Sequence, residues 1–163
     1  MWAFGVIRAW AVATLAGVSG YNKVYGTVRL ISNDTELEAD FGLGDPPEDE
    51  RQQRTHGWMV MFTGITPDEI DTYTGLEGYG LEITCYSSVH GRGSSEATFD
   101  SHANAVRLAL GADIRPVASI PNVYDVSIVV MELALVEFPR FGGRLHHRAT
   151  LRLTVRVEKP LRS

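Results

Sequence analysis

The chain has 163 residues, of which 44% are hydrophobic and 21% charged, and its formal net charge is −5 at pH 7. This length and composition are typical of one globular domain spanning residues 1–163, and they exclude collagen-like, disulfide-scaffold and wholly disordered chains. A chain of this size buries enough surface to be stable without a disulfide or a structural metal. The acidic balance argues against a dedicated nucleic-acid-binding protein, which normally carries a basic excess.

The N-terminal segment up to Val18 is almost wholly apolar and is interrupted by Arg8. The uncharged run after Arg8 is about half the roughly 20 residues of a membrane span. The cation lies inside the segment instead of ahead of it, which disfavours a signal peptide. Ile7 and Leu15 fall on one helical stripe. The pattern predicts a helix over residues 3–18 that packs on a sheet or a neighbouring subunit, and no membrane association.

The next two segments differ sharply in composition. Residues 23–31 contain β-branched and aromatic side chains and predict a first strand, made irregular by Gly26. Residues 32–54 contain eight carboxylates and two arginines, a balance of −6, and predict a long acidic loop or insertion. Loops of this length are usually functional or disordered, and a solvated flexible insertion is the simpler interpretation.

Two strands and a turn follow the acidic loop. Residues 57–62 form a continuous apolar run, typical of a strand covered on both faces. Residues 79–86 alternate with the two-residue period of a half-buried strand. Between them Thr66 and Pro67 have the residue types of a helix cap and first helical position, so one short helical turn is predicted there.

The strongest helical pattern begins at Ser94 or Ser95 and ends at Gly111. Its apolar positions are spaced by four, three and four residues, as on one face of a helix. These positions are Phe99, Ala103, Val106 and Leu110.

The last part of the chain predicts a long antiparallel hairpin. Apolar parity changes along residues 124–135, so a β-bulge or bend is expected near Met131. Residues 139–148 are the predicted hairpin loop, and residues 149–157 alternate as a strand with one buried face. The order of elements predicts an α+β fold, a mainly antiparallel sheet with helices packed on one face.

Charge is distributed unevenly along the chain. Residues 139–163 carry seven cations and one anion, a balance of +6, against −6 in residues 32–54. Opposed patches steer association and fix register, so we hypothesise that the acidic loop of one subunit meets the basic hairpin of the next. Two alternatives are separate solvated faces and pairing within one subunit. The candidate inter-subunit residues are Asp34, Glu36, Glu38, Asp45, Glu48, Asp49, Glu50, Arg140, Arg144, Arg148, Arg152 and Arg156.

Patterns for catalysis or metal binding are weak. The Gly-Arg-Gly-Ser-Ser stretch of residues 91–95 precedes a helix and could present N–H groups to an anion, but it lacks a third fingerprint glycine and a Walker lysine. Asp100 and His102 are two apart on a helix, so they are poor joint ligands with His90. Cys85 lies in an alternating apolar run and behaves as a small hydrophobe. We therefore expect no enzyme, no metal and no cofactor.

The order of elements and several stretches resemble the tail terminator (tail-completion) proteins of tailed phages. The resembling stretches are residues 7–18 leading on to Val24–Tyr25, the strand 81–86, the helix 103–110 and the last strand 151–157. Members of that family assemble as hexameric rings on the last ring of the tail tube, stop its growth and provide the surface that joins the head connector.

The resemblance implies a homo-oligomeric virion protein of the tail or neck whose partners are a tail-tube protein and a head connector or stopper protein. DNA would pass through such a ring without sequence-specific binding. Within the same group of proteins the alternatives are a head–tail connector stopper and a tail-tube-like protein. From a different class, the alternative is a small anion-binding enzyme or ligand-binding domain that uses the 90–95 loop.

Overall fold

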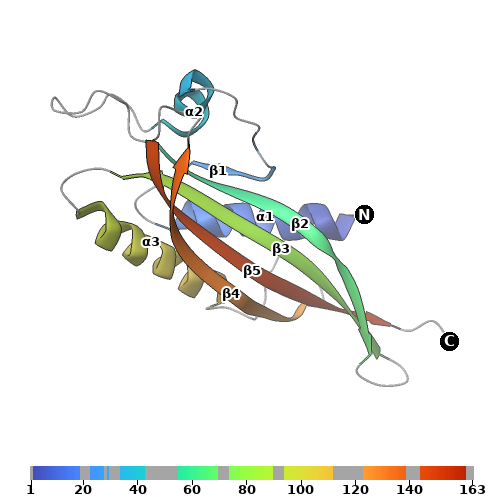
Figure 1. Ribbon diagram of the computed structural model, residues 1–163. Helices are drawn as coiled ribbons and strands as arrows, with labels where there is room; N and C mark the ends of the chain where they lie inside the picture. The colour runs from blue at the N-terminus through green and yellow to red at the C-terminus, as the bar shows by residue number, and fades with distance from the viewer. Residues whose placement is uncertain are drawn as a thin grey trace.

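The fold is a single twisted sheet with helices packed against it (Figure 1). The computed structural model describes residues 2–18, 23–27, 29, 34–42, 55–69, 74–89, 94–111, 123–138 and 144–160. The elements in chain order are α1 (Trp2–Gly17), β1 (Val24–Tyr25), α2 (Asp34–Phe41), β2 (His56–Glu69), β3 (Thr74–Ser88), α3 (Ser94–Gly111), β4 (Val123–Phe138) and β5 (Arg144–Pro160).

The strand order is β1-β2-β3-β5-β4. Every pairing is antiparallel except the short parallel contact between β1 and β2. The predicted α+β class, with a mainly antiparallel sheet and a C-terminal hairpin of β4 and β5, is confirmed.

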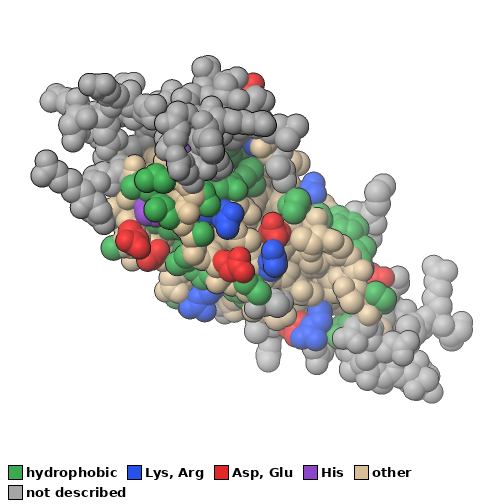
Figure 2. Space-filling view, in the orientation of Figure 1, with side chains coloured by type: hydrophobic (Ala, Val, Ile, Leu, Met, Phe, Trp, Pro, Cys, Tyr) green, Lys and Arg blue, Asp and Glu red, His purple; other side chains and the backbone are tan. Residues whose placement is uncertain are grey.

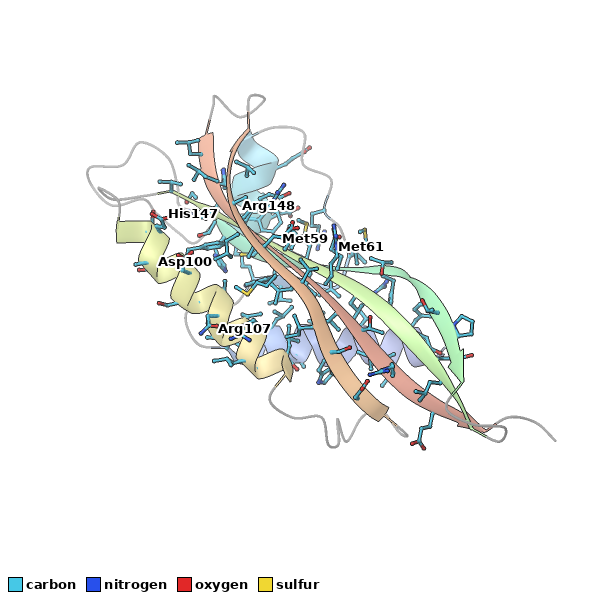
Figure 3. All side chains as sticks on the ribbon, turned by 60° about the horizontal axis from the view of Figure 1, so that its bottom comes forward. Met59, Met61, Asp100, Arg107, His147 and Arg148 are labelled. Carbon is cyan, nitrogen blue, oxygen red and sulfur yellow. The ribbon has the colours of Figure 1, made fainter. Side chains whose placement is uncertain are left out.

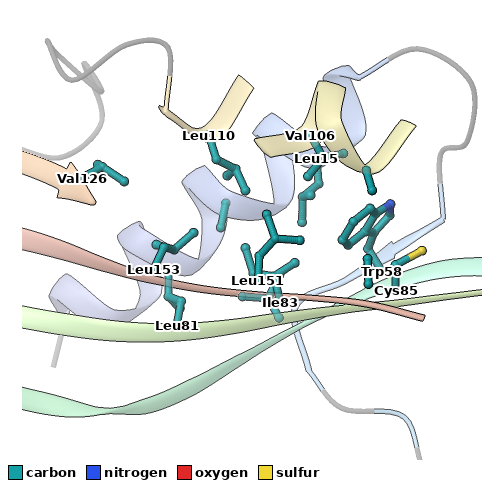
Figure 4. Close-up of a cluster of buried hydrophobic side chains, with 14 of the residues drawn as sticks. Leu15, Trp58, Leu81, Ile83, Cys85, Val106, Leu110, Val126, Leu151 and Leu153 are labelled. Carbon is teal, nitrogen blue, oxygen red and sulfur yellow. The ribbon is translucent and has the colours of Figure 1, made fainter. Parts of the chain in front are cut away.

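The core lies between the sheet and the two long helices, α1 and α3 (Figure 4). Leu81 pairs with Leu153 and Ile83 pairs with Leu151, so the inward positions of β3 and β5 form adjacent apolar rows. All four side chains are almost completely buried. This is the alternation predicted for both strands, and burial of these side chains is the main force that holds the helices on this face.

Both long helices present their predicted apolar stripes to the sheet. The fully or almost fully buried positions are Ile7, Ala11 and Leu15 of α1 and Phe99, Ala103, Val106 and Leu110 of α3. No helix in the described ranges is long and apolar enough to cross a membrane. We call the sheet face that α1 and α3 cover the helical face, and the opposite one the open face.

Two strands, β4 and β2, change register with their neighbours. In β4 the register with β5 shifts between Ile128 and Val130, which confirms the bulge predicted near Met131. In β2 the register with β3 shifts between Phe62 and Gly64. Gly64 has a φ of 152°, a value that residues other than glycine rarely adopt. The bulges turn apolar side chains back to the helical face after a change of parity.

Three predictions about element boundaries are wrong. Residues Thr66–Glu69 are part of β2 and pair with β3 as far as Gly75, because strand pairing outweighs a local helix-cap signal. Within the described part of the predicted strand 23–31, only Val24–Tyr25 is strand. The connection predicted over 139–148 is shorter, since β5 already begins at Arg144 and pairs with Phe138.

The predicted acidic loop of residues 32–54 contains a helix, α2, which corrects the first half of that prediction. Residues 43–54 lie outside the described residues. Phe41, at the end of α2, is 1% exposed and packs with Met59, Tyr25 and Tyr86. Gly57 makes this packing possible, because a Cβ there would lie 1.8 Å from Cδ1 of Phe41. One buried aromatic ring thus docks an otherwise acidic helix onto the open face.

Candidate functional site

The predicted acidic side of the interface lies partly in α2. Asp34, Glu36 and Glu38 belong to this helix, and the side chain of Glu36 is exposed. The remaining acidic candidates, Asp45, Glu48, Asp49 and Glu50, lie outside the described residues. Phe41 packs α2, which carries these acidic candidates, against the open face of the sheet.

The predicted basic side lies on β5. Arg148, Arg152 and Arg156 share the open face, as their strand parity predicts. Arg144 begins the strand, and Arg140 lies outside the described residues. The structure therefore brings the described basic candidates into one row along one strand.

Two of these arginines are paired within their own chain. Arg152 donates from Nε to Glu82 Oε2 across the β3–β5 ladder at 3.0 Å. Arg156 binds both carboxylate oxygens of Asp125 on β4, with Nε 2.6 Å from Oδ1. Bidentate arginine–carboxylate contacts have the stronger geometry, whereas Arg152 is 55% exposed and its ion pair contributes little to stability.

The acidic helix and the first of these arginines lie at the same end of the open face. Arg148 pairs in register with Tyr86, and Tyr86 pairs with Gly57, which lies under Phe41 of α2. Figure 2 shows positive and negative side chains interspersed over the described part of the surface that faces the viewer. Arg152 and Arg156 pair within their own chain with Glu82 and Asp125, which are not among the acidic candidates, so a contact between the acidic and the basic candidates, within or between subunits, stays a prediction.

A pocket of about 340 Å³ lies between the first turns of α3 and the last part of β4. We call it the α3–β4 groove. Its lining residues are Val89, Ser95, Glu96, Phe99, Asp100, Leu133, Ala134, Leu135 and His147. The leucines and Phe99 make its floor apolar, and the two carboxylates give its rim a negative charge.

The polar part of the groove is a serine–histidine contact. Ser95 Oγ lies 3.0 Å from His147 Nε2, and the His147 ring stacks on Phe99 with centroids 5.1 Å apart. Figure 3 shows His147 beside the first turns of α3 and Asp100 further along the helix. Both Ser95 and His147 are more than nine-tenths buried, so the contact joins α3 to β5 and satisfies two buried polar groups.

A second set of buried histidines lies under the same end of the sheet. Trp58 donates from Nε1 to His102 Nε2 at 3.1 Å, so this nitrogen of His102 carries no proton. His56 lies beside the ring of His102 and within 3.8 Å of Cys85 Sγ. Burial, with a smaller effect of His102, lowers the pKa of His56 from 6.5 to about 3. His56 is therefore a neutral core side chain at neutral pH.

The residues considered for catalysis or metal binding do not form a site in the described ranges. Asp100 is exposed at the groove, whereas His102 points into the core toward Trp58, so the two do not converge. No group of three or more His, Cys, Asp or Glu side chains among the described residues could hold a metal ion. Burial raises the pKa of the Cys85 thiol well above its usual value, which makes it a poor nucleophile.

The anion-binding alternative requires the 90–95 loop, of which residues 90–93 lie outside the described residues. The groove next to this loop is lined by Glu96 and Asp100, and by no lysine or arginine among the described residues. An acidic rim repels phosphate and attracts cationic groups. The groove therefore suits an apolar or cationic protein surface better than an anion.

The fold is similar over its whole length to a chain in a solved structure described as the virion of a native gene transfer agent (GTA) particle. The similarity covers 95% of this chain and 96% of that chain, with a TM-score of 0.50 and 19% sequence identity. At this identity the likeness establishes the shared fold. No protein-family model and no curated protein matches the sequence.

The α3–β4 groove is not evident from the sequence. Leu133 and Leu135 have the apolar parity of buried strand residues, but they are 45% and 58% exposed. The sequence carries no signal for this exposure, because it depends on how far the first turns of α3 cover the neighbouring β4.

Proposed function

We propose that this chain is a structural virion protein, a ring-forming tail terminator that caps the tail tube and forms the head–tail joining surface. The observation that carries the proposal is the whole-length fold likeness to a chain of the gene transfer agent virion. The elements behind the phage-tail resemblance in the sequence include α1, β3, α3 and β5, and residues of all four lie in the hydrophobic core of this chain.

The chemistry of the described surface also favours a role in assembly. The thiol of Cys85 is buried, and the contact of His147 with Ser95 joins α3 to β5. The α3–β4 groove combines exposed leucines with carboxylates. Exposed apolar side chains that gather at one place mark protein interaction sites more often than catalytic ones.

The open face has properties that suit the wall of a channel through which DNA passes. Arg152 and Arg156 lie beside Glu82 and Asp125, so their positive charge is locally balanced. Phosphate groups bind tightly where many cations act together. A surface of balanced charges allows DNA to slide past without being retained.

The ring is tested by native mass spectrometry and negative-stain imaging of the full chain. We expect a species of six 18.0 kDa copies with six-fold symmetry. When tail-tube protein assembles in the presence of the rings, tubes should stop growing and carry one ring at the end. Tubes that grow without limit would contradict termination and favour a tube-like role, and rings that bind only connector would favour a stopper.

The charged contact between subunits is tested with Arg148→Glu, because Arg152 and Arg156 already have carboxylate partners in their own chain. Leu108→Glu, on the side of α3 that faces away from the sheet, is the control for an added negative charge. We expect Arg148→Glu to weaken the ring in low salt and Leu108→Glu to leave it unchanged. If both variants form rings as the unmodified chain does, the acidic and basic patches do not meet between subunits.

A further inference from the structure

Two strands have outer edges without a partner strand in the part of the chain that the structure describes. β4 pairs with β5 alone, and from Val130 to Phe138 its register is unbroken. At the opposite edge, β1 covers β2 only at Trp58 and Met59, so β2 is open from Val60 onward. Open edges of this kind can pair with another chain unless bulges, prolines, charges or a covering segment protect them.

We call Val130–Phe138 the β4 edge and Val60–Thr66 the β2 edge. The β4 edge contains neither a proline nor a bulge. The exposed carboxylate of Glu132 belongs to the open face, since Glu132 pairs with the outward position of β5. On the helical face, the edge exposes Leu133 and Leu135 at the α3–β4 groove. An edge of unbroken register with exposed leucines beside it fits an added strand that carries apolar side chains.

The β2 edge carries matching side chains. Ile65 is 45% exposed, and its pairing with Tyr79 places it on the helical face. Phe62 lies on the same face, and the guanidinium of Arg8 from α1 lies over its ring at 5.0 Å from the centroid. Arg8 Nε is buried and has no hydrogen-bond partner among the described residues. The β2 edge therefore combines apolar side chains with a cation.

The two edges are complementary in charge and in polarity. In the helical layer α1 lies on the β2 side and α3 on the β4 side (Figures 1 and 3). If the β2 edge of one copy pairs with the β4 edge of another, α1 with Arg8 comes beside α3, whose Glu96 and Asp100 form the acidic rim. Ile65 comes over the leucines of the groove when the second copy is also shifted along the strands, because the registers through Tyr79 and Val155 place Ile65 level with Val126.

The strand directions also agree with this pairing. Three antiparallel steps separate β2 from β4, so the two strands run in opposite directions. Copies in the same orientation then form an antiparallel pair, and the sheet and its helical layer continue from copy to copy. Because the contact joins two different surfaces, it repeats and closes into a ring when the rotation allows.

We infer that the β4 edge, together with the α3–β4 groove, binds the β2 edge of a second copy of this chain. The inference deepens the proposed function, on which it rests for the closed ring. The contact adds a strand to the sheet through backbone hydrogen bonds, and the leucines and the acidic rim select the partner edge.

The first test compares Leu135→Lys with Leu108→Lys in the full chain. Leu108 is a matched control, because it is 53% exposed but lies on the side of α3 that faces away from the sheet. We expect Leu135→Lys to weaken self-association more than about tenfold, since it places a charge in the contact, and Leu108→Lys to have no effect. Sedimentation velocity measures the association, and circular dichroism checks that both variants are folded.

The second test distinguishes this contact from a symmetric pairing of two β4 edges. Ile65→Lys damages only the β2 edge, and Leu135→Lys damages only the β4 edge. Each variant alone should be monomeric, and an equimolar mixture should form one-to-one dimers through the remaining good pair of edges. An Ile65→Lys variant that still dimerises, with no new species on mixing, would overturn the inference in favour of β4–β4 pairing.

The outcomes separate this inference from the proposed function. Rings that persist in Leu135→Lys and still cap tubes overturn the inference and leave the function in place. If Leu135→Lys abolishes the ring, the inference is supported. If rings of the unmodified chain at the same time do not stop the growth of tubes, the proposed function is contradicted. An unmodified chain that is monomeric, or equal loss of association in Leu108→Lys, also overturns the inference.

Discussion

His56 makes the stability of this fold sensitive to acid. The side chain is 0% exposed, and burial, together with His102, lowers its pKa from 6.5 to about 3. As the pH falls below 6.5, the unfolded chain binds a proton at this position that the folded chain does not accept until about pH 3. Protonation therefore stabilises the unfolded state relative to the folded state, and stability is lost between pH 6.5 and pH 3.

The loss is already large enough to measure at pH 5. One pH unit of unequal protonation corresponds to about 1.4 kcal/mol, so roughly 1.5 units below the unfolded pKa give a loss of about 2 kcal/mol. Continued to about pH 3, the loss reaches about 5 kcal/mol. Because pH 5 lies well above the folded pKa, the value there depends almost entirely on the unfolded pKa of 6.5.

The assay is urea unfolding of the unmodified chain and of His56→Gln at about pH 7.5 and at about pH 5, on either side of the unfolded pKa. The difference in the free energy of unfolding between the two pH values, taken within each protein, does not contain the packing cost of the substitution. The difference between the two proteins then cancels the contribution from the titration of the carboxylates. We expect the unmodified chain to lose about 2 kcal/mol more than the variant between the two pH values. An equal pH dependence in both proteins would refute the reasoning, because His56 would then not be a buried neutral group.

Two further predictions concern packing on the two faces of the sheet. Gly57→Ala should cost about 1–3 kcal/mol in thermal unfolding, because its Cβ would overlap the Phe41 ring, and an unchanged melting temperature would contradict that contact. The control Gly5→Ala, on an open side of α1, should stabilise by about 0.5–1 kcal/mol. Leu151→Ala should cost about 2–5 kcal/mol, and Leu135→Ala no more than about 0.5 kcal/mol. Equal losses in the two leucine variants would contradict the assignment of Leu151 to the core.

The core of the fold could be predicted because its signals are local and periodic. Helix α3 has its apolar side chains at helical spacing, and the buried row of β5 alternates without interruption from Ala149 to Val157. In such segments propensity and burial favour the same structure. The bulge of β4 could be predicted for a related reason, since an inserted residue is the usual way for one strand to change its apolar parity.

The parts that the sequence does not predict depend on contacts between distant residues. Helix α2 has Leu37 and Phe41 four residues apart, but so acidic a segment predicts a loop until Gly57 is known to leave room for the Phe41 ring. Likewise, Thr66 has the residue type of a helix cap, and only the pairing of β2 with β3 makes it a strand residue. In both cases a distant partner overrides the local preference.

For the candidate surfaces, the sequence predicts which residues are charged but not which residues they pair with. Carboxylates and arginines on a strand are outward whether they pair within one chain or with another, so the sequence could not separate Arg156, bound to Asp125, from Arg148. The choice depends on which residue of the neighbouring strand lies opposite, and this is set by the register of the whole sheet.

For the apolar side chains of the groove, the sequence likewise does not predict whether they are buried in the core or exposed. Leu133 and Leu135 have the parity of core residues because β4 returns to the helical face after its bulge. A side chain that packs under a helix and one that packs under a neighbouring subunit obey the same two-residue period. They differ only in how far the helical layer covers them: Ile128 and Met131 pack against the core, whereas these two leucines line the groove beside the first turns of α3 and are about half exposed. This exposed part of β4 beside α3 is therefore better explained as a surface for another protein chain than as an excess of core.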